Sequence, residues 1–239
     1  MKKLIIGLAI ILGVSVDAKA QENKKKSDSL TAIQQKMITI SAFTAKGELE
    51  LLKTELNGGL DAGLTVNEIK EVLVHLYAYC GFPRSLQGLQ TFMAVLDERK
   101  ARGINDQQGK PASPIKDRRS KYERGKEVLG KLSGAPQSGK RTGYAAFSPE
   151  IEIFLKEHLF ADIFERDVLT YSQRELVTVS ALIALGGVEP MMKSHMGLFL
   201  KQGFAPAQLS QLINVIEINV GKKEADVAKL VLTEVVSKS

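Results

Sequence analysis

The sequence predicts an all-α fold, and three features of its 239 residues support this prediction. First, apolar residues recur with the 3.6-residue period of a helix face. Second, the predicted helices have recognisable ends, such as the capping box from Thr65 to Glu68 and the terminating glycines Gly47 and Gly63. Third, no segment alternates apolar and polar residues as a strand would, and no hairpin turn signal occurs.

An internal repeat organises these predicted helices. Leu30–Glu50 aligns with Leu169–Glu189 at an offset of 139 residues, and an offset of 140 continues the match as far as Gly81 and Gly221. This period is too long for a solenoid, whose units span roughly 20–50 residues. The sequence therefore predicts two copies of one helical module.

The N-terminus has the composition of a secretory signal peptide, which we assign to residues 1–20. Lys2-Lys3 is followed by a short apolar run at 4–16 and by Ala18-Lys19-Ala20, a small-x-small cleavage site. An uncleaved anchor helix is the alternative, but it would need about 20 apolar residues. We expect cleavage near Ala20 and a periplasmic or secreted protein. Residues 21–28 are polar and are predicted to be disordered.

The first module is assigned to residues 29–99. Its helices are expected at about 31–46, 48–62, 65–80 and 84–99. The third begins at the capping box and carries an apolar stripe that includes Cys80. Gly81 and Pro83 end it.

A linker with one charged helix, at about 118–131, is assigned to residues 100–147, and the second module to 148–239. The helices of the second module are expected at about 149–159, 172–185, 188–202, 206–220 and 223–236. A short aromatic loop with Phe160 and Phe164 should follow the first of these. A second capping box is predicted from Ser172 to Glu175.

Charge and composition exclude some partners. Residues 1–20 hold three Lys and one Asp, so their removal lowers the net charge from +6 to +4. Much of the remaining positive charge lies in Lys24-Lys25-Lys26 and in the segment 99–141, and the chain contains no Trp. A nucleic-acid partner would need a concentrated basic stripe or a stacking platform, so we expect none. The mature chain should not insert into a membrane, and the single cysteine, Cys80, has no internal disulfide partner.

Glu175 is the first candidate catalytic residue, because it lies in a helix with hardly any polar face. A carboxyl group in apolar surroundings can act as a proton donor or acceptor. The structural alternative is that Glu175 bonds the backbone at Ser172 as part of the predicted capping box. The sequence leaves both interpretations open.

Two further candidates are His195 and the row formed by Glu71, His75 and Tyr79. His195 has Met191, Met192 and Phe199 within one helical turn. A lone histidine beside apolar neighbours is more often structural than catalytic. The row has i, i+4, i+8 spacing beside an apolar stripe. Such a row is usually a solvated face, but at an interface between modules it would line a pocket.

The repeat relates these residues to one another. Glu175 aligns with Lys36, His195 with Glu55, His75 with Val215 and Tyr79 with Asn219. If the modules pack about a pseudo-two-fold axis, two mixed sites form. One site would contain Glu175, His195, His75 and Tyr79. The other would contain the four aligned residues and would be inactive.

The stretch Leu60–Pro83, LDAGLTVNEIKEVLVHLYAYCGFP, and the stretch Arg174–His195 resemble the carboxymuconolactone decarboxylase family, which also includes alkylhydroperoxidase D. The resemblance implies two repeated all-α modules of the alkylhydroperoxidase D-like type. Because single-module members assemble as trimers or hexamers, it also implies a homo-oligomer, a trimer of tandem chains. Decarboxylase members act on a γ-carboxymuconolactone without a metal, and peroxidase-type members use a Cys-x-x-Cys pair that both copies lack.

We therefore predict cofactor-free and metal-free acid–base chemistry, lyase-like or lactone-handling, on a small carboxylated substrate. Glu175 and His195 would exchange protons, His75 would assist as a third catalytic candidate, and Tyr79 and Glu189 would bind the substrate. A peroxidase-type oxidoreductase that uses Cys80 is one alternative. A binding module without catalysis is the other.

Overall fold

The computed structural model describes residues 29–137 and 141–237. The predicted signal peptide and the polar segment 21–28 lie outside the described residues. The described part of the chain folds into helices joined by loops and forms no strand, so the predicted fold class is confirmed. None of the helices in these two ranges combines the length and the apolar character that crossing a membrane requires.

The first module contains α2 (Ala32–Lys46), α3 (Leu49–Asp61) and α4 (Val66–Ala101). Thr65 caps α4 through the predicted box with Glu68. Helix α4 has two arms, because Gly81 adopts φ 78° and ψ 165° in its interior. A side chain is strained at this positive φ, so glycine suits the bend. The two arms correspond to the helices predicted at 65–80 and 84–99.

The second module repeats this arrangement. Its helices are α8 (Tyr171–Leu185), α9 (Glu189–Lys201), α10 (Pro206–Asn219) and α11 (Lys222–Val236). Here the two arms are separate helices, with Gly221, the residue aligned with Gly81, between them.

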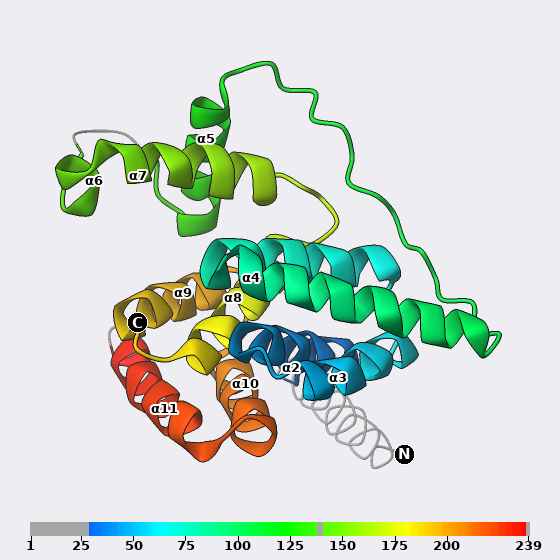
Figure 1. The fold of residues 1–239 in the computed structure, drawn as a ribbon. Coiled ribbons are helices and arrows are strands. Elements are labelled where there is room, and N and C mark those ends of the chain that lie inside the picture. The colour runs from blue at the N-terminus through cyan, green and yellow to red at the C-terminus, as the bar shows by residue number, and fades with distance from the viewer. Residues whose placement is uncertain (1–28, 138–140, 238–239) are drawn as a thin grey trace, which may run out of the picture.

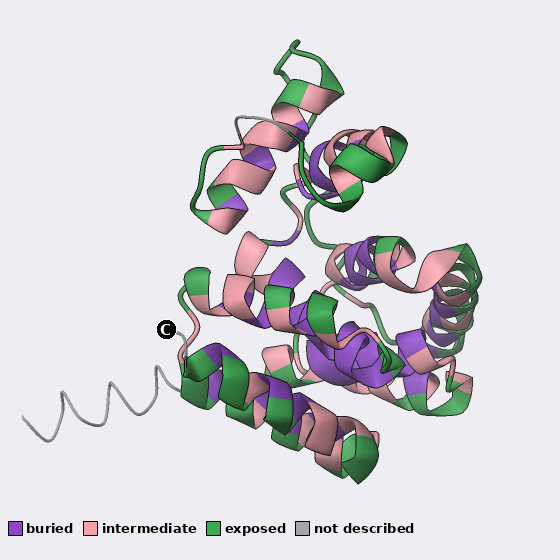
Figure 2. Ribbon diagram, turned by 90° about the vertical axis from the view of Figure 1, so that its left-hand side faces the viewer, coloured by how far each residue is buried: buried purple, intermediate pink, exposed green. Residues whose placement is uncertain are grey.

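The two modules pack reciprocally around a central pair, α2 against α8 (Figure 1). The first arm of α4 packs against α8 of the other module, and α10 packs against α2. Both central helices are buried over most of their length, and apolar side chains from the two modules form one continuous core (Figure 2). This is the pseudo-symmetric packing that a site shared between modules requires.

The helical part of the linker and the first residues of the second module together form a second layer above this body (Figure 1). It contains α5 (Lys121–Ser133), α6 (Tyr144–Phe147), α7 (Pro149–Phe154) and the π-helix η1 (Leu155–Ile163). Gly125 of α5 lies so close to η1 that a Cβ atom there would be 1.7 Å from the Lys156 carbonyl oxygen. Glycine is therefore what allows α5 and η1 to pack.

The prediction of an aromatic loop with Phe160 and Phe164 is wrong for Phe160, which lies inside η1. The helix continues because its apolar side chains pack against α5. The small core of this layer consists of Val128, Leu132, Leu159, Phe160, Ile163 and Phe164.

The start of the linker is bound to the first module. The N–H groups of Val66 and Asn67 donate to the carbonyls of Gln107 and Gln108, at 2.9 and 3.0 Å. These N–H groups belong to the first turn of α4, which has no intrahelical partners for them. The linker thus satisfies the N-terminus of the helix that carries His75 and Tyr79.

Candidate functional site

The start of α8 determines where Glu175 lies. The capping residue is Thr170, whose hydroxyl accepts a hydrogen bond from the N–H of Gln173, while the Gln173 side chain bonds back to Thr170. The predicted capping box with Ser172 and Glu175 is therefore wrong. Ser172 instead donates to the carbonyl of Gln202. Because α8 begins earlier than predicted, Glu175 lies in its second turn and is fully buried.

Glu175 forms a pair with His195 of α9. Its Oε2 lies 2.9 Å from Nδ1 of the imidazole, whereas its Oε1 is buried and has no hydrogen-bond partner among the described residues. The His195 side chain is 16% exposed and that of Glu175 is 0% exposed, so solvent reaches the imidazole but not the carboxylate. A buried carboxylate in this position orients an imidazole.

Tyr79, at the end of the first arm of α4, connects this pair to His75. Its ring lies edge-on to His195 with 5.5 Å between centroids, and 5.2 Å from the ring of His75. The phenol oxygen is buried and meets no hydrogen-bond geometry with any described group. Burial raises the pKa of Tyr79, and the charge of Glu175 raises it further. The hydroxyl therefore stays protonated at neutral pH.

His75 is fully buried, and both of its ring nitrogens have partners on α8. Nε2 lies 2.8 Å from the Thr178 hydroxyl, and Nδ1 lies 3.3 Å from Nη1 of Arg174. Burial, together with the positive charge of Arg174, holds the pKa of His75 well below its ordinary value. The ring is consequently neutral.

A buried ion pair that the sequence analysis missed supports this region. Arg174 is 0% exposed, and its Nη2 lies 2.7 Å from Oε1 of Glu71 and 2.6 Å from the carbonyl oxygen of Arg166. The Arg166 guanidinium binds the same carboxylate from the solvent side at 2.9 Å. Burial lowers the pKa of Arg174, and Glu71 counteracts this effect.

Of the two interpretations of this row, a solvated face or an interface between modules, Glu71 and His75 fit the second. These side chains are 2% and 0% exposed, because α8 of the other module covers the first arm of α4. One signal in the sequence pointed to this outcome. Two adjacent charged residues, Arg174 and Glu175, stand in an otherwise apolar helix, where each charge needs a partner.

The aligned residues of the other half also meet. Nζ of Lys36 lies 2.9 Å from Oε2 of Glu55, so the ion pair lies where Glu175 and His195 lie in the second module. Thr39, aligned with Thr178, also donates to Glu55. Val215 and Asn219 contribute no ring, and the Asn219 amide donates to the carbonyl of Val215. This half therefore lacks an imidazole and a phenol.

Two other predicted residues, Glu189 and Cys80, lie outside the cluster. The Glu189 carboxylate accepts a hydrogen bond from the N–H of Gly187, a local contact at the start of α9. Lys193 forms an ion pair with Glu234. Cys80 is half-buried, its thiol donates to the carbonyl of Leu76, and burial raises its pKa to about 11. Within the two described ranges, no three His, Cys, Asp or Glu side chains gather as metal ligands would.

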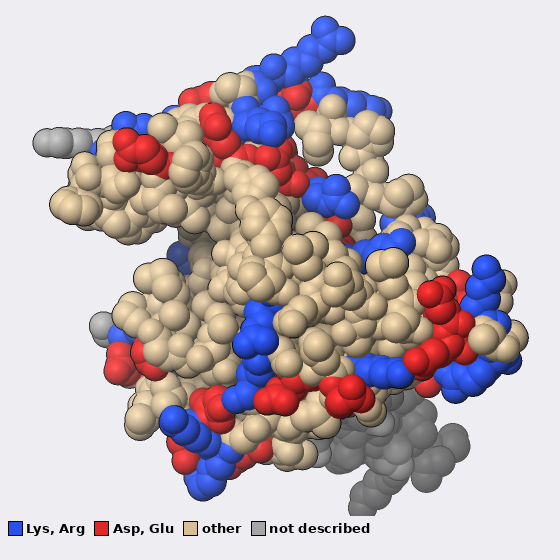
Figure 3. Space-filling model, viewed as in Figure 1, with Lys and Arg blue, Asp and Glu red and all other residues tan. Residues whose placement is uncertain are grey.

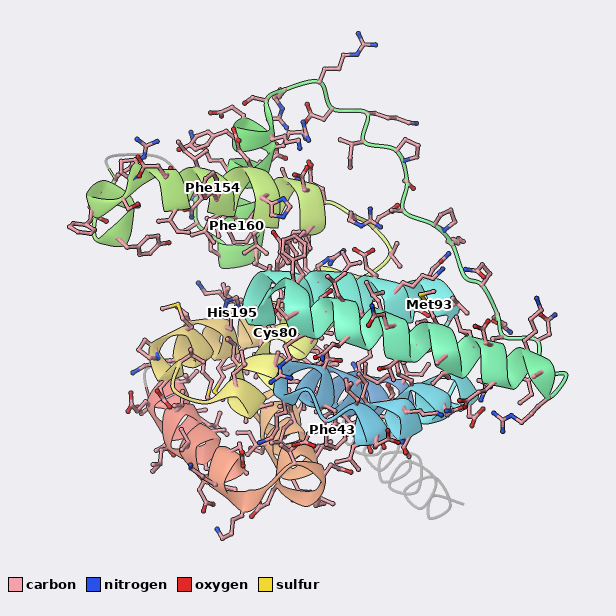
Figure 4. The ribbon with its side chains drawn as sticks, in the orientation of Figure 1. Phe43, Cys80, Met93, Phe154, Phe160 and His195 are labelled. Atoms are coloured by element: carbon pink, nitrogen blue, oxygen red, sulfur yellow. The ribbon has the colours of Figure 1, made fainter. Side chains whose placement is uncertain are left out.

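Figure 4 places His195 on α9, on the side of the body that faces the upper layer with Phe160. On this side of the molecule the surface is hollowed between the upper layer and the body (Figure 3). A separate depression is lined by α5 and the residues on either side of it, including Arg119 and Gln137, and it contains none of the clustered residues.

Comparison with known protein families gives a match. The profile of the carboxymuconolactone decarboxylase family matches twice, at residues 17–92 and 149–234, as expected of a tandem repeat. A search of curated proteins finds no significant match to the chain.

Proposed function

Because the chain belongs to the carboxymuconolactone decarboxylase family, we propose that it is an enzyme that transfers protons on a small carboxylated substrate, lactone or acid, without a cofactor. The observation that carries this proposal is the pair formed by the fully buried Glu175 and the partly exposed His195. A carboxylate–imidazole pair in this arrangement suits general acid–base catalysis.

His195 is the proposed proton carrier. Its Nδ1 faces Glu175, so Nε2 is the nitrogen that exchanges a proton with the substrate. The buried carboxylate orients the imidazole, and contact with solvent gives the imidazole a route for proton exchange after each turnover. In a decarboxylation, the bond to the leaving carboxylate breaks and its electron pair moves into the conjugated carbonyl. His195 then delivers a proton to the carbon that lost carbon dioxide.

Tyr79 is the proposed electrophilic group. Its hydroxyl is protonated and faces no competing protein acceptor in hydrogen-bond geometry. It can therefore donate to the oxygen on which negative charge develops, a contribution that strengthens in the transition state. Both nitrogens of His75 are engaged by Thr178 and Arg174, so we assign His75 to positioning and not to proton transfer.

A thiol peroxidase is the weaker alternative. Such an enzyme needs a reactive thiolate, and one whose pKa is raised to about 11 is mostly protonated at neutral pH. The chain also has no second cysteine with which Cys80 could cycle through an internal disulfide.

The proposal is tested by incubating the mature protein with a γ-carboxymuconolactone and measuring carbon dioxide release and the change in ultraviolet absorbance. We expect turnover that falls by about 10²–10⁴-fold in Glu175→Gln and His195→Gln. The aligned variants Lys36→Gln and Glu55→Gln are matched controls and should retain turnover. Equal turnover in His195→Gln and the parent protein would rule out the proposed proton carrier. Binding without turnover would leave a binding module.

Export and assembly are parts of the same proposal. A leader cleaved near Ala20 would deliver the protein to the periplasm or the medium. The proposed homo-oligomer is a trimer of tandem chains, and the exposed apolar side chains on the second arm of α4 offer a surface for self-association. These are Phe82, Leu86 and Met93, which are 60%, 52% and 64% exposed.

A further inference from the structure

We propose that Arg174 and Thr178 are positioning residues that fix the direction of hydrogen bonding from His75 to Tyr79. They would do so by holding His75 in the tautomer that carries its proton on Nε2. The consequence for catalysis rests on the proposed function. The tautomer itself is a property of the folded protein and is independent of any reaction.

The direction follows from what an arginine can do. A guanidinium has only donors, so the contact of 3.3 Å between Nη1 of Arg174 and Nδ1 of His75 requires Nδ1 to be the acceptor. The buried ring is neutral and has one proton, which must then be on Nε2. Nε2 therefore donates to the Thr178 hydroxyl, 2.8 Å away.

Thr178 extends this chain of hydrogen bonds from His75 toward Tyr79. Its oxygen accepts from His75, so its own hydrogen is available for another acceptor. The ring of Tyr79 lies 5.2 Å from that of His75, and its buried hydroxyl has no partner in hydrogen-bond geometry. Thr178 lowers the pKa of this phenol, so we infer that the free hydrogen of Thr178 is donated to the Tyr79 oxygen. The phenol hydrogen is then left for the substrate.

The guanidinium is itself held in place. Glu71 and the carbonyl of Arg166 accept hydrogen bonds from its Nη2, so Nη1 is directed at His75. The arrangement joins the modules, because Glu71 and His75 lie on α4 and Arg174 and Thr178 on α8. In the other half, Gln35 aligns with Arg174 and Val215 with His75, so the same chain of donors cannot form there.

The first test is nitrogen NMR of the full mature chain labelled in its histidines. The chain has three histidines, so His75→Gln assigns the signals of interest. We expect Nδ1 of His75 to resonate as an unprotonated nitrogen and Nε2 as a protonated one. In Arg174→Gln the two tautomers should mix. A proton on Nδ1 of His75 in the parent protein would overturn the proposal.

The second test separates positioning from folding. Thr178→Val removes the hydroxyl at nearly constant shape, Thr178→Ser restores it, and Thr39→Val is the matched change at the aligned position. We expect kcat to fall about tenfold in Thr178→Val while KM stays within about twofold of the parent value. Thr178→Ser should restore kcat. The hydroxyl proton of Tyr79 should also exchange faster with solvent in Thr178→Val than in Thr39→Val.

The two tests distinguish a failure of this inference from a failure of the proposed function. If the parent protein turns over no lactone or acid, the proposed function fails, but the His75 tautomer and the Tyr79 proton exchange still decide the inference. If the protein is active and Thr178→Val matches Thr39→Val in kcat and in proton exchange, the inference fails and the proposed function stands.

Discussion

Replacing Glu71 by Gln removes one charge from the buried pair with Arg174 and keeps the size of the side chain. Both side chains are almost fully buried, at 2% and 0% exposed. Breaking a buried pair costs about 3–5 kcal/mol, because the remaining charge is left without compensation. Arg174 keeps the carbonyl of Arg166 as a partner, so we expect the lower end, about 3 kcal/mol. This is a large fraction of a typical unfolding free energy of about 5–15 kcal/mol.

The assay is urea unfolding followed by far-ultraviolet circular dichroism, because the chain has no Trp for fluorescence. The midpoint should fall while the slope stays constant. The matched control is Glu55→Gln, which breaks the more exposed pair with Lys36 and should cost at most about 1 kcal/mol. Glu71→Leu combined with Arg174→Met should recover much of the loss. A cost below about 1 kcal/mol for Glu71→Gln would refute our account of the buried pair.

Three further outcomes are expected. The folded pKa of His75 is lowered, so its contribution to stability is complete above the unfolded value of 6.5 and is lost as pH falls below it. Between pH 7 and 5.5 the parent protein should therefore lose about 1 kcal/mol more than His75→Gln in urea unfolding, and equal losses would contradict this. Alkylation of Cys80 should be slow at pH 7 and accelerate as pH approaches about 11, whereas fast labelling at pH 7 would revive the thiol-based alternative. Met93→Glu should weaken self-association in light scattering without lowering the unfolding midpoint, and an unchanged mass would exclude this face from the contact.

Local signals in the sequence were sufficient to predict most helix boundaries. The box at Thr65, the glycine after Lys46 and the bend at Gly81 depend on the backbone within one turn, and they lie where predicted. The start of α8 differs because two boxes overlap there, one from Thr170 and one from Ser172. The repeat held the information to choose between them, since Thr31 and Gln34 form the same box at the start of α2.

Local sequence patterns could not predict the burial of the site. The sequence spacing correctly placed Glu71, His75 and Tyr79 in one row, but only the packing of α8 on α4 decides whether that row meets water or Arg174. The π-helix η1 was missed for a similar reason. Its continuation depends on contacts with α5, which lies more than twenty residues earlier in the chain.

The reciprocal contact of α4 with α8 and of α10 with α2 has an evolutionary consequence. In an assembly of identical subunits, every substitution is present in each subunit, so a change that harms one active centre harms all of them. A gene fusion ends this obligation, because each half mutates alone. Lys36 and Glu55 form an ion pair at the positions where Glu175 and His195 keep a carboxylate and an imidazole. Joining two copies in one polypeptide thus allows one half to keep the reactive groups while the other replaces them.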